Sequence, residues 1–230
     1  MPEPLRFVIL CLGRTGSTHL QSMLDFHSQA RCLGEIFGDG KPPTFAGSGE
    51  SDPAAYLDSM LGGGEERASG FKLPMQSIRL TPAAAEIVVG DPAMAVIRLS
   101  RRDRLAQLVS RRLMAETGVS QSIFGSYGDA TVRIDPAECV AALRGIEADE
   151  AELDGICTGH RVFRIAYEEL DAERRLVELQ LFLGLEPEPL RSWFEKLRVR
   201  SLPETVSNWE ELKNALNEVG YGRFTDESPD

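Results

Sequence analysis

Short apolar runs alternate along the chain with longer stretches in which apolar residues recur every three or four positions. A continuous apolar run of about four to eight residues is typical of a buried strand, and the wider spacing is typical of a helix with one buried face. The pattern predicts a first strand and helix within Arg6–His27, a strand or turn over Ala30–Phe37, strands over Gly70–Leu73, Ala93–Ser100 and Arg161–Ile165, and helices over Ala54–Leu61, from Leu105 onward, and over Pro136–Leu153, Ala172–Leu183, Pro189–Arg198 and Asn208–Asn217.

Strands that alternate with helices predict parallel βαβ units and an α/β layered fold. In such a fold, ligands bind beyond the carboxyl ends of the strands. The segment Gly13–Thr18 follows the first predicted strand, and another polar segment follows Ser100. We therefore expect these two segments to line one pocket.

The segment between the first strand and the first helix has the composition of a phosphate-binding loop. Gly13-Arg-Thr-Gly-Ser-Thr18 combines two glycines with three hydroxyls and one guanidinium. The glycines let the backbone approach a ligand, and a helix N-terminus behind a tight turn points N–H groups at an anion. Ser17 follows Gly16, where the loop of nucleotide triphosphatases has a lysine. The loop therefore favours a different phosphate-like group.

Composition sets the class of protein. The 230 residues are consistent with a single domain over 1–230 that carries two long loops at about 38–53 and 118–134. The formal net charge of −11 argues against nucleic acid or an acidic membrane as partner. The N-terminal apolar run is too short to span a membrane and lacks signal-peptide features, so we expect no transmembrane segment and a cytoplasmic location. No C-x-x-C pair occurs, so the cysteines are expected to be reduced, buried thiols and not metal ligands: Cys11, Cys32, Cys139 and Cys157.

Arginines gather where the predicted strand Ala93–Ser100 ends. Arg98, Arg101, Arg102 and Arg104 surround the start of the next helix, which normally favours acidic residues. With no local compensation expected, the cluster indicates an anionic partner. Arg102 and Ser110, eight positions apart, are candidates for gripping a second phosphate. The strand ends on Ser100 and arginines, without the aspartate that holds Mg²⁺ in Walker-type enzymes, so we expect no metal.

These segments together resemble the PAPS-dependent sulfotransferases (PAPS is 3′-phosphoadenosine 5′-phosphosulfate). The loop resembles the family's 5′-phosphosulfate loop, and Arg102 with Ser110 resembles its 3′-phosphate pair. The resemblance is closest to bacterial carbohydrate and lipopolysaccharide sulfotransferases of the trehalose 2-sulfotransferase type. It rests on Gly13–Leu20, Arg102 with Ser110, Arg164–Leu170 followed by Leu181–Leu185, and Ser207–Leu212. The C-terminal Arg-Lys-Gly motif of the animal cytosolic enzymes is absent, which leaves the adenine contacts unassigned.

The resemblance implies a P-loop-like, three-layer α/β fold with a central, mostly parallel sheet flanked by helices. It also implies sulfuryl transfer from PAPS to a carbohydrate or glycolipid hydroxyl, with adenosine 3′,5′-bisphosphate as the product and no metal. Arg14 would bind the 5′-phosphosulfate and offset charge on the leaving phosphate, and Arg102 with Ser110 would hold the 3′-phosphate. The remaining donors to the 5′-phosphosulfate would be Thr15, Gly16, Ser17 and Thr18.

Three side chains are candidates for the reacting centre beside Arg14. Glu35 occupies the position of the family's proposed base. The alternative interpretation is that Glu35 is an ordinary exposed acidic residue in a turn. His19 is the second candidate for the base, although a structural role is the more common one at such a position. Lys72 is expected either to approach the transferred group or to pack its stem and extend its head into solvent.

The two long loops are expected to form the acceptor walls. Their aromatic residues, Phe45, Phe124 and Tyr127, either stack on a sugar ring or hold the loops in place. Two other functions remain open, namely a non-catalytic module that binds a nucleotide or anion, and a divergent nucleotide kinase. The acceptor and the oligomeric state are left open by the sequence, a homodimer being one of the states it allows.

Overall fold

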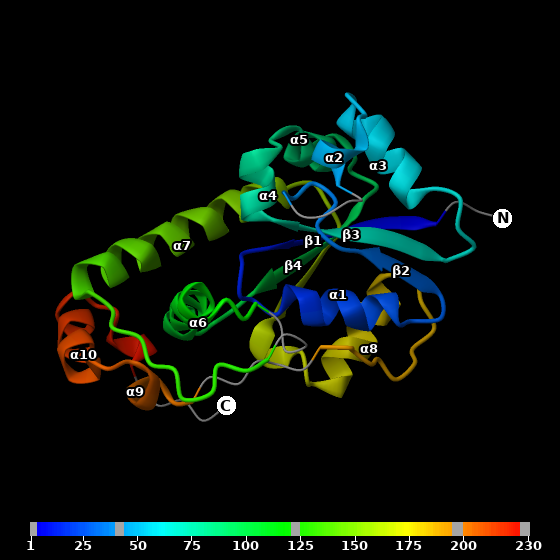
Figure 1. The fold of residues 1–230 in the computed structure, drawn as a ribbon. Helices are drawn as coiled ribbons and strands as arrows, with labels where there is room; N and C mark the ends of the chain where they lie inside the picture. The colour runs from blue at the N-terminus through cyan, green and yellow to red at the C-terminus, as the bar shows by residue number, and fades with distance from the viewer. Residues whose placement is uncertain (1–3, 40–43, 121–124, 195–199, 226–230) are drawn as a thin grey trace. The chain divides into compact units, whose positions relative to one another are not determined.

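A computed structural model describes residues 4–39, 44–120, 125–194 and 200–225. Its centre is a five-stranded parallel sheet in the order β2-β3-β1-β4-β5 (Figure 1). The central strand is buried on both faces, as its continuous apolar sequence requires. The strands are β1 (Leu5–Cys11), β2 (Ala30–Leu33), β3 (Ala68–Pro74), β4 (Ala95–Ser100) and β5 (Val162–Ala166).

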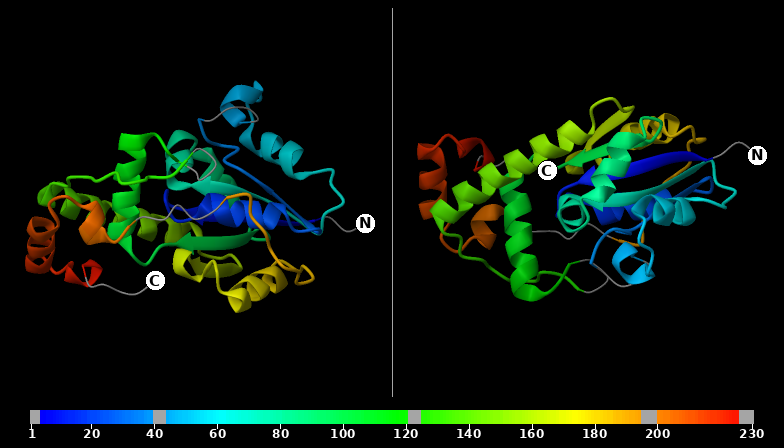
Figure 2. Two further views of the ribbon diagram at one scale, coloured as in Figure 1. Left: turned by 60° about the horizontal axis from the view of Figure 1, so that its bottom comes forward. Right: turned by 90° about the horizontal axis from the view of Figure 1, so that it is seen from above.

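Helices cover both faces of the sheet. On one face, α1 (Ser17–Asp25) and α8 (Glu173–Phe182) pack against β1 through a cluster that includes Phe7, Leu24 and Leu179. On the other face lie the short helices α2 (Phe45–Ser48), α3 (Pro53–Leu61), α4 (Met75–Leu80) and α5 (Ala83–Gly90) (Figures 1 and 2). The α/β fold with a parallel sheet between two helical layers is therefore confirmed.

The chain divides into two compact units. The first comprises Met1–Ser100 with Glu150–Trp193 and contains the sheet. The second comprises Arg101–Asp149 with Phe194–Asp230, and its core joins α6 (Arg104–Thr117), α10 (Trp209–Glu218) and the first part of α7 (Pro136–Ile156). The single domain over 1–230 stays a prediction. The remaining short elements are α9 (Leu202–Thr205) and the 3-10 turns η2 (Tyr167–Glu169) and η3 (Gly222–Phe224).

Most predicted elements lie within a few residues of the observed ones. The strand-or-turn prediction over Ala30–Phe37 resolves into β2 followed by a turn. The helix expected over Pro189–Arg198 is wrong for residues 189–194, which form no helix, and its remaining part lies outside the described residues. Trp193, within that predicted helix, is 75% exposed and contacts Phe26, with 4.8 Å between ring centroids.

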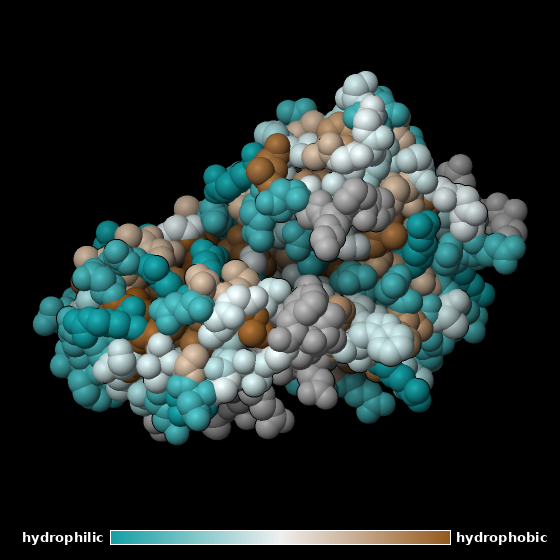
Figure 3. Space-filling view, viewed as in Figure 1, coloured by the Kyte–Doolittle hydropathy of each residue, from teal (hydrophilic) through white to brown (hydrophobic). Residues whose placement is uncertain are grey.

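The surface is mainly polar. Hydrophilic residues dominate the face seen in Figure 3, and apolar atoms are scattered over it. Among the described residues, no helix combines the length and the apolar character that crossing a membrane requires. The large exposed apolar side chains belong to Phe26, Leu80, Val89, Leu181, Trp193 and Val219.

Candidate functional site

The loop between β1 and α1 has an unusual backbone. Gly16 has φ 78°, and Arg14 has φ 67°, the one positive φ outside glycine among the described residues. A side chain in this region costs about 1–2 kcal/mol. No acidic residue lies in the first turn of α1, and no side chain caps its N-terminus. A helix start of this kind, with neither an acidic residue nor a side-chain cap, suits an anion.

The hydroxyls of the loop differ in their surroundings. Thr15 is buried, and its hydroxyl donates to the carbonyl oxygen of Leu12 at 2.8 Å. Because the hydroxyl is used in this way, the predicted contact of Thr15 with the 5′-phosphosulfate would be made by its backbone N–H. Ser17 is also buried, and its side chain lies next to the thiol of Cys11 at the end of β1. Burial raises the pKa of the Cys11 thiol, while the Lys72 charge and a hydrogen bond from Ser17 lower it.

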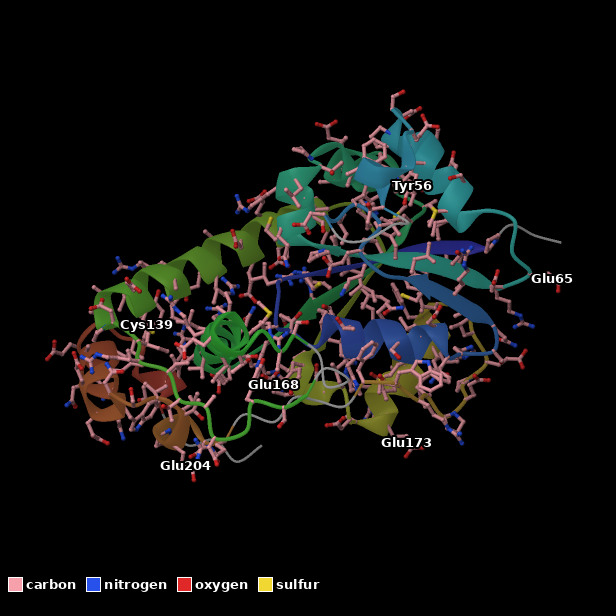
Figure 4. All side chains as sticks on the ribbon, in the orientation of Figure 1. Tyr56, Glu65, Cys139, Glu168, Glu173 and Glu204 are labelled. Atoms are coloured by element: carbon pink, nitrogen blue, oxygen red, sulfur yellow. The ribbon has the colours of Figure 1, made fainter. Side chains whose placement is uncertain are left out.

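Gly16 lies against the turn that follows β5. A Cβ atom at Gly16 would lie 2.7 Å from Cδ2 of Tyr167 and 2.9 Å from Cδ1 of Leu170. Figure 4 shows this turn, with Glu168 labelled, beside the start of α1. Tyr167 therefore supports the loop by direct contact.

We expect Gly16→Ala to lower the stability of the fold by about 2–4 kcal/mol, because it adds both left-handed strain and an overpacked contact. Thermal unfolding measures this loss directly. Gly145→Ala is the matched control, since Gly145 lies in α7 with no atom within 4 Å of an added Cβ. That control should gain about 0.5–1 kcal/mol. Equal unfolding temperatures for the two variants would contradict the contact with Tyr167.

Lys72 connects the loop to an acidic residue. It lies on β3 beside β1, and only 6% of the residue is exposed. Its Nζ atom donates to Oγ1 of Thr18 at 3.1 Å and lies 2.9 Å from Oε1 of Glu35. The expected alternative of a head group in solvent is therefore wrong. A positive charge is fixed at the end of the loop, next to the first turn of α1.

Glu35 follows β2 in a tight turn. The N–H of Gly38 donates to the Glu35 carbonyl at 3.0 Å, and the side chain is 38% exposed. The register of β2 with β3 pairs Leu33 with Phe71, which brings the residues just beyond them together. Glu35 is thus more than an exposed turn acid, because its carboxylate is both paired with Lys72 and reachable from solvent. His19, the second candidate for the base, is half-buried in the first turn of α1.

Two arginines of the cluster at the end of β4, Arg98 and Arg104, have acidic partners, contrary to expectation. Arg98 is 3% exposed and lies 3.1 Å from Oδ1 of Asp154. Burial alone would raise the pKa of Asp154, but hydrogen bonds from Arg164 and Arg98 and their charges hold it below the usual value. Arg104 pairs with Glu147 at 2.7 Å. Because Arg98 and Arg104 pair with carboxylates of the protein, neither of them indicates an anionic ligand by itself.

The predicted 3′-phosphate pair lies in the second unit. Arg102 is exposed and precedes α6, whose N-terminus is capped by the Asp103 carboxylate, which accepts from the Ala106 N–H at 2.8 Å. Ser110 is buried in α6, with its hydroxyl 3.2 Å from the Tyr127 hydroxyl. Tyr127 therefore holds its own loop against α6, and its oxygen lies beside the predicted phosphate ligand.

An aromatic cluster lies close to Glu35 in the sequence. The Phe37 ring lies 5.9 Å from Phe45 and 5.8 Å from both Tyr56 and Phe71, between centroids. Tyr56 comes from α3 (Figure 4). Phe45 thus holds the start of α2 against this cluster. Phe124 lies outside the described residues.

Sequence reasoning missed Gln76, the second residue of α4. Its side chain is exposed, and its amide lies against the first glycine of the loop, with Nε2 3.5 Å from the Cβ position of Gly13. The signal was present in Lys72-Leu-Pro-Met-Gln76, where a polar residue follows a strand end.

The first unit therefore contains an uncapped helix start, a guanidinium, a buried ammonium and a carboxylate. This arrangement suits a reaction in which a charged group is transferred and a proton is removed. Within the described residues, no group of three or more His, Cys, Asp or Glu side chains is arranged to hold a metal ion.

No protein-family model and no curated protein matches the chain. Among solved structures, the fold matches the crystal structure of a sulfotransferase from Alicyclobacillus acidocaldarius with a TM-score of 0.54. The match covers 97% of this chain and 95% of that chain, at 17% sequence identity. The chain therefore has a sulfotransferase-like fold, as the motifs imply.

Proposed function

We propose that this protein is a sulfotransferase that moves a sulfuryl group from PAPS to a hydroxyl of a carbohydrate or glycolipid. The observation that carries the proposal is the position of Lys72. Its ammonium group contacts Thr18, at the end of the loop Gly13–Thr18 (the anion loop), and also the carboxylate of Glu35. This contact joins a site for a transferred anionic group to a group that can accept a proton. The sulfotransferase-like fold supports the same interpretation.

In the proposed reaction, Glu35 accepts the proton of the acceptor hydroxyl as the hydroxyl oxygen bonds to sulfur. The bond between sulfur and the 5′-phosphate oxygen breaks, and the product is adenosine 3′,5′-bisphosphate. Arg14 and the N–H groups of Gly16, Ser17 and Thr18 stabilise the charge that grows on that phosphate. Lys72 keeps a positive charge at the same end of the loop. The 38–53 and 118–134 segments are proposed as acceptor walls, and a cytoplasmic location belongs to the same proposal.

The donor is tested by thermal unfolding with adenosine 3′,5′-bisphosphate, AMP and Mg-ATP. A ligand at one hundred times its Kd adds about 2.7 kcal/mol, which is several degrees for a chain of this size. We expect the bisphosphate to give the largest shift. A shift with Mg-ATP alone would contradict the proposal and favour a kinase.

Arg102 and Ser110 are proposed to bind the 3′-phosphate. Arg102→Ala should weaken binding of the bisphosphate by about 10–100-fold and leave AMP binding unchanged, because a charged hydrogen bond contributes about 1.5–3 kcal/mol. Titration calorimetry measures both affinities. Arg112→Ala removes the same charge from α6, where Arg112 pairs with Glu138, and should change neither affinity. Equal losses for both ligands in Arg102→Ala would remove Arg102 from this role.

A further inference from the structure

The β3–α4 segment reaches the anion loop at both ends. Lys72, near the end of β3, contacts Thr18 where the loop enters α1. Four residues later, Gln76 lies against Gly13, where the loop leaves β1. The register pairs Cys11 with Pro74, so Gly13 and Gln76 each lie two residues beyond the same pair at the carboxyl edge of the sheet. One segment therefore brings an ammonium group to one end of the loop and an amide to the other.

The Gln76 amide has the features of a ligand-binding group. The side chain is exposed, and among residues 4–39, 44–120, 125–194 and 200–225 no hydrogen-bond partner of its amide is found. The amide lies beside Gly13, with Nε2 at 3.5 Å and Oε1 at 3.7 Å from the position that a Cβ atom would take. Its NH₂ group is therefore next to the loop and exposed, where a ligand bound to the loop can reach it.

We propose that the Gln76 amide donates a hydrogen bond to the sulfuryl group of PAPS, an inference that rests on the proposed function. The start of α1 offers N–H groups and a positive dipole end, which suit the phosphate. Gln76 lies at the opposite end of the loop and carries no charge. A neutral donor suits the sulfuryl group, which must be held during transfer and then released to the acceptor.

The experiment compares two ligands that differ only in the sulfuryl group, PAPS and adenosine 3′,5′-bisphosphate. Gln76→Met keeps the length of the side chain and removes the amide. We expect it to weaken PAPS binding by about tenfold, the effect of one lost hydrogen bond to a charged group, and to change bisphosphate binding less than twofold. Gln76→Ala should give the same selective loss if the amide, and not the bulk of methionine, is responsible. Leu80→Met is the control, since Leu80 is 58% exposed on the same helix.

The outcomes separate this proposal from the proposed function. If the wild-type protein binds both ligands and the Gln76 variants weaken both equally or neither, the role of Gln76 is wrong and the proposed function stands. If the wild-type protein binds neither ligand, the proposed function fails, and this inference fails with it. A loss confined to PAPS supports the contact between Gln76 and the sulfuryl group.

Discussion

Replacing Glu35 with glutamine is expected to lower kcat by about 10²–10⁴-fold, because the variant cannot accept the proton of the acceptor hydroxyl. The affinity for adenosine 3′,5′-bisphosphate should stay the same. A glutamine side-chain oxygen can still accept the hydrogen bond from Lys72, whose Nζ lies 2.9 Å from Oε1 of Glu35. Steady-state kinetics with PAPS, together with calorimetric titration of the bisphosphate, measure the two effects separately.

Glu65→Gln is the matched control for Glu35→Gln. It makes the same chemical change at an exposed position outside the proposed site and should leave kcat unchanged. Lys72→Met supplies the contrast, because it removes the shared donor of Thr18 and Glu35 and should lower both affinity and kcat. If Glu35→Gln instead weakened binding as much as turnover, Glu35 would be a binding residue and the base would lie elsewhere.

Arg14→Ala is expected to lower kcat/KM by about 10²–10³-fold, the cost of losing one positioned donor to a developing negative charge. Bisphosphate binding should weaken as well, because the guanidinium also contacts the ground-state phosphate in this account. Arg14→Lys tests the forked geometry, since lysine keeps the charge but cannot donate from a rigid planar group. We expect lysine to restore only part of the activity.

Arg14→Gly separates the loss of function from instability. Arg14 has φ 67°, which glycine adopts without the penalty that other residues incur. The glycine variant should therefore unfold at the same temperature as the wild-type protein or higher, and still be as impaired as Arg14→Ala. A glycine variant that kept full activity would show that the strained backbone, and not the guanidinium, serves the reaction.

The loop and its flanking elements could be predicted from the sequence because their signals are local. The apolar run before Gly13 and the helical repeat after Thr18 are contiguous, so the strand, the turn and the helix follow directly. The helices α4 and α5 were missed. The first is a short helix of six residues after Pro74, and the second is apolar almost throughout, which hides its helical repeat.

The pairing of Lys72 with Glu35 could not be predicted, because it depends on which strands are neighbours. The two residues are far apart in the sequence, and only the parallel register of β2 with β3 brings them together. The ion pair between Arg104 and Glu147 could not be predicted either, because it depends on the packing of α6 against α7. The helix over Pro189–Arg198 was predicted from apolar residues at helical spacing, but residues 189–194 form no helix.

The central claim is that this site transfers a sulfuryl group to a carbohydrate hydroxyl. The most direct test is to incubate the protein with PAPS and a panel of carbohydrate and glycolipid acceptors, and to follow release of adenosine 3′,5′-bisphosphate together with the sulfated product. We predict that at least one acceptor gives equal amounts of both products, and that Glu35→Gln slows their formation by about 10²–10⁴-fold. Tight binding of PAPS without bisphosphate release for any acceptor would contradict the claim and identify a non-catalytic binding module.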